Sequence, residues 1–246
     1  MVSFHSVKGS SGFWEKVLTL FPISKPRTPT VVARGKEDLK LGIRYLVMAT
    51  ENGIMKKTEI SEFENVRRSG LIAISLKKGD LLKAVQKSSG EDEIILVTQK
   101  GQAIRFKEKD IRPMGRQAAG IKGMRLKRED KVVGMDIIKI KNSKLKIKNY
   151  LLVVTENGYG KRTDLAEYRL QKRGGSGIKT AKITSKTGNL VFSKLISEEE
   201  DLIVIAKKGK VIRTKISQIA KLSRATQGVK IMKLEEGDRV ASATCI

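Results

Sequence analysis

The sequence is nearly without the side chains that most active sites and metal centres use. Its 246 residues include one cysteine, Cys245, and one histidine, His5. A single thiol and a single imidazole exclude an internal disulfide framework, the usual zinc sites and any histidine-dependent triad. The Gly-rich lysine loop of nucleotide-binding enzymes is missing too. We therefore expect no catalytic residue, no metal and no cofactor in this chain.

Long apolar runs and aromatic side chains are also scarce. No run approaches the roughly 18 apolar residues of a membrane span, and the first residues, MVSFHSVKGSSGFW, lack the apolar core of a secretion signal. Together with the missing disulfide framework, this predicts a cytoplasmic protein without a membrane partner. Aromatic residues make up 4% of the chain, which disfavours the stacking platforms that bind single-stranded nucleic acid.

Positive charge is what the chain has in excess. Lysine and arginine number 51 against 26 aspartate and glutamate, which gives a formal net charge of +25 and a pI of about 10.2. A field of this size indicates a polyanionic partner. The bases are spread along the chain rather than gathered on one amphipathic helix, which favours nucleic acid over a membrane. We expect contacts to the backbone of duplex DNA; the alternative from another class is a propeller that binds an acidic protein.

A repeat with a period near fifty residues organises the sequence. Each copy has a short apolar run, a turn that ends in glycine, a base four residues later and a second glycine. The apolar runs are 46–49, 94–97, 151–154 and 202–205, the first glycines are Gly53, Gly101, Gly158 and Gly209, and the second glycines are Gly70, Gly120, Gly177 and Gly228. Copies of this length with four strand-like runs are typical of a radial array of blades.

We therefore predict an all-β fold of four-stranded antiparallel units, about four of them complete and one partial. The repeats are 44–93, 94–149, 150–201 and 202–246, and residues 1–43 form a leader, a partial blade and a loop; the whole of 1–246 is one domain. A hairpin is expected to open each unit, and the run after the second glycine is assigned to the same unit. Short helical turns are predicted within 164–170 and 217–222.

Bases recur at fixed places in the repeats, which predicts a stepped row of cations for a long polyanion. Arg116, Arg173 and Arg224 lie four residues before the second glycine, and Lys122, Lys179 and Lys230 lie two residues after it. Alternation along the returning strands predicts that their bases point outward. The candidate DNA-binding residues are Lys56, Lys57, Arg67, Arg68, Arg105, Lys107, Arg112, Arg116, Lys122, Lys161, Arg162, Gln171, Lys172, Arg173, Gly174, Gly175, Gly177, Lys179, Arg213, Lys215, Arg224 and Lys230.

Several strings resemble one known family: YLVMATENGIMKKT, ILVTQKGQAIRF, IRPMGRQAAGIKGMRL, YLLVVTENGYGKRT and ATQGVKIMKLEEGDRVASA. They are similar to the C-terminal domain of bacterial DNA gyrase A, over residues 15–246. The resemblance implies a six-bladed β-pinwheel, a propeller-like ring whose basic rim wraps duplex DNA with a positive superhelical sense. Four blades and part of a fifth are accounted for here. The implied role is a non-catalytic DNA-wrapping module of an ATP-dependent type IIA topoisomerase, with the rest of gyrase A and with gyrase B as partners.

The same resemblance bears on the loop at 171–177, QKRGGSG. The family's seven-residue gyrase A box reads Q-basic-R-G-G-basic-G, and this loop is similar except that Ser176 stands where the box has a base. DNA contact carries over to the matching residues. The family's DNA-cleaving tyrosine lies in another domain, so this chain is not expected to cleave DNA. The alternative within the resemblance is the equivalent C-terminal domain of topoisomerase IV.

Overall fold

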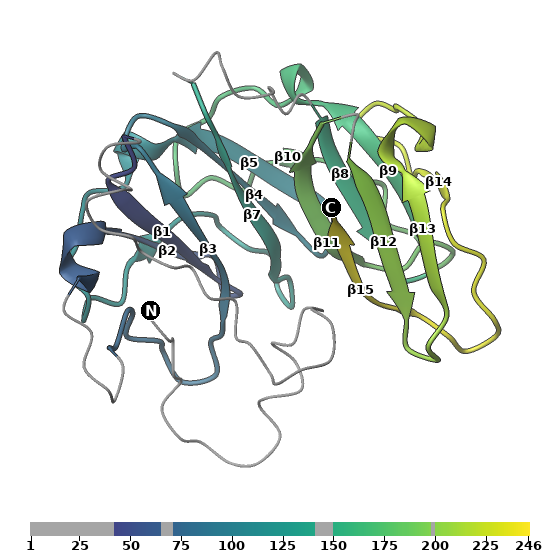
Figure 1. The fold of residues 1–246 in the computed structure, drawn as a ribbon, viewed down its shortest axis with the longest axis horizontal. Coiled ribbons are helices and arrows are strands. Elements are labelled where there is room, and N and C mark those ends of the chain that lie inside the picture. The colour runs from purple at the N-terminus through teal and green to yellow at the C-terminus, as the bar shows by residue number, and fades with distance from the viewer. Residues whose placement is uncertain (1–41, 65–70, 141–149, 198–199) are drawn as a thin grey trace.

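The computed structural model describes residues 42–64, 71–140, 150–197 and 200–246, and these residues form the all-β fold that the sequence predicts (Figure 1). Every strand pairing between named strands is antiparallel. The predicted leader and partial blade lie outside the described residues, except for the end of the loop. No helix in the described parts of the chain is both long and apolar enough to cross a membrane.

Four sheets follow one another along the chain. The first joins β3 (Leu82–Ser88), β1 (Tyr45–Thr50), β2 (Ile54–Glu59) and β6 (Ile121–Lys122), in that order. The second joins β7 (Val132–Ile138), β4 (Glu93–Thr98), β5 (Gln102–Lys107) and β10 (Ile178–Lys179). The third joins β11 (Leu190–Ile196), β8 (Tyr150–Thr155), β9 (Tyr159–Asp164) and β14 (Val229–Lys230). The fourth joins β15 (Val240–Cys245), β12 (Asp201–Ala206) and β13 (Val211–Lys215).

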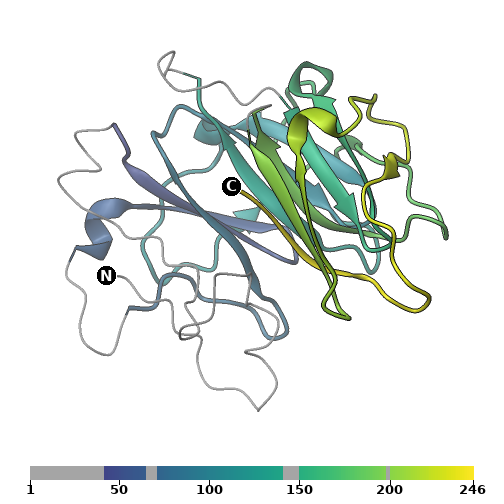
Figure 2. The same ribbon diagram turned by 45° about the vertical axis from the view of Figure 1, so that its right-hand side comes forward.

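The sheets are blades arranged in an arc, with the first blade and the last at its two ends (Figures 1 and 2). Neighbouring blades meet through their inner strands, because β7 packs beside both β3 and β11, and β11 packs beside β15. The predicted opening hairpin is present in each unit, as β1–β2, β4–β5, β8–β9 and β12–β13. The short strands β6, β10 and β14 lie at the opposite, outer edge of their sheets.

The run after the second glycine does not stay in its own unit, so that part of the prediction is wrong. Strand β10 belongs to the third repeat but pairs with β5 of the second, with Ile178 opposite Ala103. A Cβ atom on Gly177 would lie 2.5 Å from the carbonyl oxygen of Ala103, closer than real Cβ atoms approach. Glycine therefore lets the chain press against the preceding blade. Each four-stranded blade is completed by the repeat that follows it.

Apolar side chains fill the spaces between blades as well as within them. One cluster joins Val47 and Met55 of the first blade to Ile94, Leu96 and Ile104 of the second, all at most 1% exposed. Similar clusters join the second blade to the third and the third to the fourth. Burial of this kind contributes about 25 cal/mol per Å² of apolar surface, so each blade depends on its neighbour for stability.

One turn of 3₁₀ helix follows the second strand of each repeat. The helices are η2 (Ile60–Phe63), η3 (Glu108–Asp110), η4 (Leu165–Glu167) and η5 (Ile216–Gln218). η4 confirms the turn expected within 164–170, and η5 overlaps the range 217–222 but begins one residue before it. In η4 the carboxylate of Asp164 accepts a hydrogen bond from the N–H of Ala166 at 2.9 Å and caps the turn.

Candidate nucleic-acid interface

Three exposed lysines lie on the outer strands of three successive blades. Lys122 is in β6, Lys179 in β10 and Lys230 in β14, and each side chain is exposed. Because these strands are the outermost of their sheets, the lysines form a stepped row along the outer edge of the arc. The structure thus brings together the three bases that follow the second glycine, as the repeat predicts.

A second row of bases accompanies the first and was missed from the sequence. Arg125, Lys182 and Lys233 each lie five residues after the second glycine, and all three are exposed. Continuing the count of offsets past the outer strand would have found them, because their spacing repeats as strictly as that of Lys122. We name these six residues the outer row.

The loop at 171–177 lies against the preceding blade. The N–H of Gln171 donates to the carbonyl of Arg105 at 2.8 Å, and the N–H of Gly174 donates to the carbonyl of Gly123 at 2.7 Å. The carbonyl of Gly175 accepts from the N–H of Arg125 at 2.8 Å. These hydrogen bonds hold two blades together. A phosphate-binding nest needs free backbone N–H groups, and those of Gln171 and Gly174 are already bonded. DNA contact by this loop stays a prediction.

Lysine and arginine differ within that loop. Lys172 is exposed, whereas the guanidinium of Arg173 donates to the carbonyl of Asp110 at 3.1 Å and to the carbonyl of Lys122. The Arg173 side chain is half-buried, and its guanidinium reaches across the boundary between two blades. In the last joint Arg224 repeats this contact, donating to the carbonyl of Lys179 at 3.0 Å. Arg116 is half-buried as well.

The prediction that Lys56 and Lys161 contact DNA is wrong, because both side chains are 0% exposed. The Lys161 ammonium donates to the carbonyls of Ser223 and Arg224 at 2.6 and 2.8 Å and to the hydroxyl of Thr226 at 3.0 Å. Lys56 donates to the carbonyl of Ala73 at 2.7 Å and to a loop carbonyl of the next repeat. These lysines satisfy backbone oxygens between blades, and a phosphate cannot reach them.

The pKa of each of these two buried lysines is lowered. Burial lowers the pKa of Lys56 from 10.5 to about 8, with Arg116 adding to the fall and Glu62 opposing it. Burial lowers the pKa of Lys161 to about 8 in the same way, with Arg224 and Glu167 in the corresponding roles. Desolvation thus weakens the hold of each ammonium on its proton.

The bases four residues after the first glycine are mostly engaged between blades. Lys57 is 3% exposed and lies 3.6 Å from the buried carboxylate of Glu108, so its assignment to the interface is wrong. Arg105 forms an ion pair with Glu93 at 2.6 Å and donates to two carbonyls of the third repeat. Arg162 donates to two carbonyls around η5, at 2.8 and 3.0 Å. The expected outward direction is therefore wrong for Lys57 and only partly met by Arg105 and Arg162.

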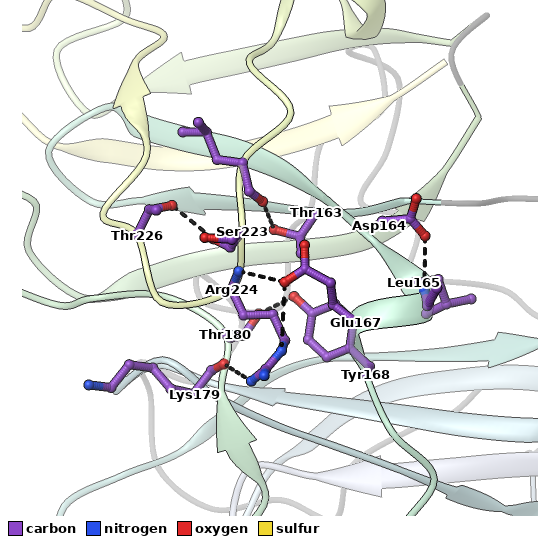
Figure 3. Close-up of polar contacts among 12 residues, drawn as sticks. Thr163, Asp164, Leu165, Glu167, Tyr168, Lys179, Thr180, Ser223, Arg224 and Thr226 are labelled. Carbon is purple, nitrogen blue, oxygen red and sulfur yellow. Dashed lines mark hydrogen bonds and ion pairs between the residues drawn. The ribbon is translucent and has the colours of Figure 1, made fainter.

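Figure 3 shows the polar network at the joint between the third and fourth blades. One carboxylate oxygen of Glu167 accepts from the backbone N–H of Arg224 at 3.1 Å and lies 3.9 Å from its guanidinium. Beneath it the hydroxyl of Tyr168 bonds that of Thr180 at 2.5 Å. Burial raises the pKa of Tyr168 to about 12, so it stays protonated and serves packing.

The remaining predicted bases fall into two sets. Lys107, Arg112, Arg213 and Lys215 are exposed, and Arg213 forms an ion pair with Asp201 at 2.6 Å. Arg67 and Arg68 lie outside the described residues. Within the described parts of the chain, no three His, Cys, Asp or Glu side chains lie together in a way that could hold a metal ion.

Comparison with known families agrees with the geometry. A family model described as the DNA gyrase C-terminal domain, a β-propeller, matches residues 44–89, 92–139, 149–197 and 200–246. The chain belongs to this family. The expected resemblance and the β-pinwheel-like fold class are thereby confirmed. The four matched stretches correspond to the four sequence repeats, each of which supplies the inner three strands of one blade.

Among gyrase relatives, the chain is 44% identical over 206 residues to the DNA gyrase A protein of Staphylococcus epidermidis. The match covers 84% of this chain and 22% of that protein, so the chain spans about a fifth of its relative. A solved structure of the DNA gyrase A C-terminal domain is 28% identical, with a TM-score of 0.72, over 83% of this chain and 66% of that one. The C-terminal domain of DNA topoisomerase IV is 27% identical, with a TM-score of 0.76, over 82% and 62%.

Proposed function

We propose that this gyrase-family domain is a non-catalytic module that binds duplex DNA and bends it around its outer edge. The outer row carries the proposal, because six exposed cations recur at equal offsets on three successive blades. A stepped row suits the phosphate backbone of a curved duplex, since the same contact is offered once per blade.

The gyrase relatives support a proposal about the larger assembly. The chain is proposed to act with the remainder of gyrase A and with gyrase B, and to direct the enzyme toward supercoiling by presenting wrapped DNA. The topoisomerase IV domain superposes with a similar score, so the same surface suits that enzyme too. Sequence identity of 44% to a DNA gyrase A protein favours gyrase.

The first experiment tests the outer row by charge removal. In a variant with Lys122, Lys179 and Lys230 changed to Gln, we expect duplex affinity to fall and the slope of log affinity against log salt to decrease by about 2 to 3 units. The matched control changes Lys83, Lys131 and Arg239 to Gln. These three exposed bases lie in β3 or directly before the inner strands β7 and β15, so the same loss of charge should leave the slope nearly unchanged.

Wrapping is tested separately from binding. A closed circular plasmid is relaxed by a type I topoisomerase in the presence of the purified chain, and the linking number is measured after removal of protein. A shift that grows with protein and disappears in the outer-row variant supports wrapping. Binding without a shift would contradict wrapping, and equal weak binding by both variants would favour an acidic protein partner instead.

A further inference from the structure

The three joints between successive blades are built to one plan. In each joint we call one side the acceptor: it is the outer edge of a repeat's second strand together with the glycine before that strand. The other side, the donor, is the run that follows the second glycine of the next repeat. The carbonyl of Gly158 accepts from the N–H groups of Ile231 and Met232 at 2.8 and 3.1 Å. Gly53 and Gly101 accept from the third and fourth residues of the next donor in the same way.

The last blade has a complete acceptor with no donor among the described residues. Its sheet has three strands where the others have four, and β13 is the strand without an outer neighbour. Gly209 keeps the conformation of the other turn glycines, with a φ of +88°. A Cβ atom there would have nothing within 4 Å, whereas one on Gly158 would lie 2.5 Å from the carbonyl of Met232.

Two side chains of this acceptor, Val211 and Arg213, are exposed to solvent. Val211 is 57% exposed on β13. The side chain of Arg213 is 66% exposed beside Asp201, whereas Arg105 and Arg162 at the equivalent positions reach carbonyls around the next 3₁₀ helix. The acceptor is therefore preformed and open.

The first repeat supplies the complementary donor. Residues 71–74 hold the positions of β6 and the two residues after it, but they form no strand in the described parts of the chain. Ala73 and Ile74 are buried in their own blade against Ile60 and Phe63. Ile72 is 53% exposed. The donor is thus anchored at one end and open at the other.

Charge decides which donor fits β13. At the internal joints a donor lysine faces an uncharged residue, such as Lys122 opposite Ile54 and Lys230 opposite Tyr159. In the last blade the acceptor residue at this place is Lys210, and lysine opposite lysine is unfavourable. Only the first repeat, with Ile72, offers an uncharged residue there. Donor and acceptor lie at opposite ends of the arc (Figures 1 and 2), so they cannot meet within one molecule.

We propose that the chain binds a second copy of itself head to tail, by adding residues 71–74 of one molecule to β13 of the next. Leu71 then faces Val211, and Ile72 faces Lys210. The carbonyl of Gly209 accepts the N–H groups of Ala73 and Ile74. Different surfaces meet in this contact, so it leaves a new donor and a new acceptor at its ends and continues into a curved filament or ring.

Sedimentation velocity on the nuclease-treated chain, over a range of concentrations and at high ionic strength to screen the net charge, measures this association. The expected result is a mass that rises with concentration beyond a dimer.

Two proline variants each remove one backbone N–H group from the proposed contact. Val211→Pro removes an N–H group of β13. That N–H points away from β12, because the neighbouring carbonyl of Lys210 bonds Ala206 on β12 at 2.8 Å. Leu71→Pro removes the N–H group that faces it from residues 71–74 of the other molecule. Each variant should associate at least about tenfold more weakly alone.

Mixing the two variants gives the decisive result. Val211→Pro keeps its donor and Leu71→Pro keeps its acceptor, so an equimolar mixture should form a 1:1 dimer that does not grow further. Misfolding of either variant cannot produce such a dimer. A wild-type chain that stays monomeric at every concentration, or variants that associate like wild type, would overturn the proposal.

A charge exchange tests the register. Ile72→Lys places lysine opposite Lys210 and should weaken association about fivefold. Adding Lys210→Glu to the same chain should restore it, because opposite charges then face each other. If the double variant stays as weak as Ile72→Lys, the strands do not meet in the proposed register.

Discussion

Two joints of the molecule differ at one equivalent position, the third residue after the turn glycine. The joint between the first two blades has a lysine there, and the joint between the middle two has an isoleucine. In the first, the ammonium of Lys56 binds the carbonyl of Ala73 at 2.7 Å. In the second, Ile104 stands at the equivalent position, three residues after the turn glycine, and the N–H of Gly174 binds the carbonyl of Gly123 at 2.7 Å. Ala73 and Gly123 are equivalent too, so one backbone oxygen is satisfied by a side chain in one joint and by the backbone in the other.

The glycine-rich loop lies against an apolar neighbour at this joint. A Cβ atom on Gly175 would lie 3.5 Å from the side chain of Ile104, which is ordinary contact distance. In the next loop Ala225 and Thr226 stand in place of Gly174 and Gly175. There the buried Lys161 donates to the carbonyls of Ser223 and Arg224 instead. The Gln171–Gly177 sequence therefore has a packing role in this blade, whatever its contact with DNA.

The largest expected effect comes from removing the bridge in a lysine joint. Lys161→Met leaves two carbonyls and one hydroxyl without their charged donor, and we expect the free energy of unfolding to fall by about 3 kcal/mol. Urea denaturation measures it. Lys179→Met, an exposed lysine of the same unit, is the control and should change stability by less than about 0.5 kcal/mol. An equal loss in both variants would break the distinction between bridging and surface lysines.

A smaller effect should separate two glycines of the glycine joint. Gly177 and Gly174 both have positive φ, +74° and +81°. A Cβ on Gly177 would lie 2.5 Å from a carbonyl oxygen, whereas the nearest atom to one on Gly174 is 3.8 Å away. Thermal or urea unfolding should therefore show a loss of about 2 kcal/mol for Gly177→Ala and about 1 kcal/mol for Gly174→Ala. Equal losses would mean that only backbone conformation, and not close approach, requires Gly177.

A pH dependence of stability is also expected from the lysine joints. The pKa of Lys161 is about 8 in the folded chain and 10.5 in the reference state. Between these values the unfolded chain binds more protons, so the free energy of unfolding contributed by Lys161 rises with pH, by at most about 1.4 kcal/mol per pH unit. Below pH 8 this gain is absent.

Urea unfolding of wild type and Lys161→Met between pH 8 and pH 10 isolates the contribution. Wild type should gain more stability over this interval than the variant, whose curve should be flatter. Tyr168, with its pKa raised to about 12, acts in the opposite direction only above pH 10. Parallel curves would show that Lys161 keeps an ordinary pKa despite its burial.

Sequence reasoning succeeded where a short-range pattern controls the structure. Short apolar runs followed by turns that end in glycine predicted the hairpins, and the repeat predicted Lys122, Lys179 and Lys230 as a row. It failed for Lys56 and Lys161, because a lysine beside a turn has the same sequence signature whether its ammonium faces water or a carbonyl of the next repeat. It also assigned β6, β10 and β14 to the wrong blades, since strand pairing between repeats leaves no local signal.

The amino-acid sequence by itself determined the all-β class, the number of repeats, the excess of positive charge and the family. These follow from composition, periodicity and matched strings, which need no coordinates. Only the tertiary structure decided which bases are exposed, that each blade is completed by the following repeat, and that β13 has no outer neighbour among the residues that the structure describes. Those properties depend on contacts between residues far apart in the sequence, as in Lys161 with Ser223 and Ile178 with Ala103. Burial at such contacts is set by the packing of neighbouring blades.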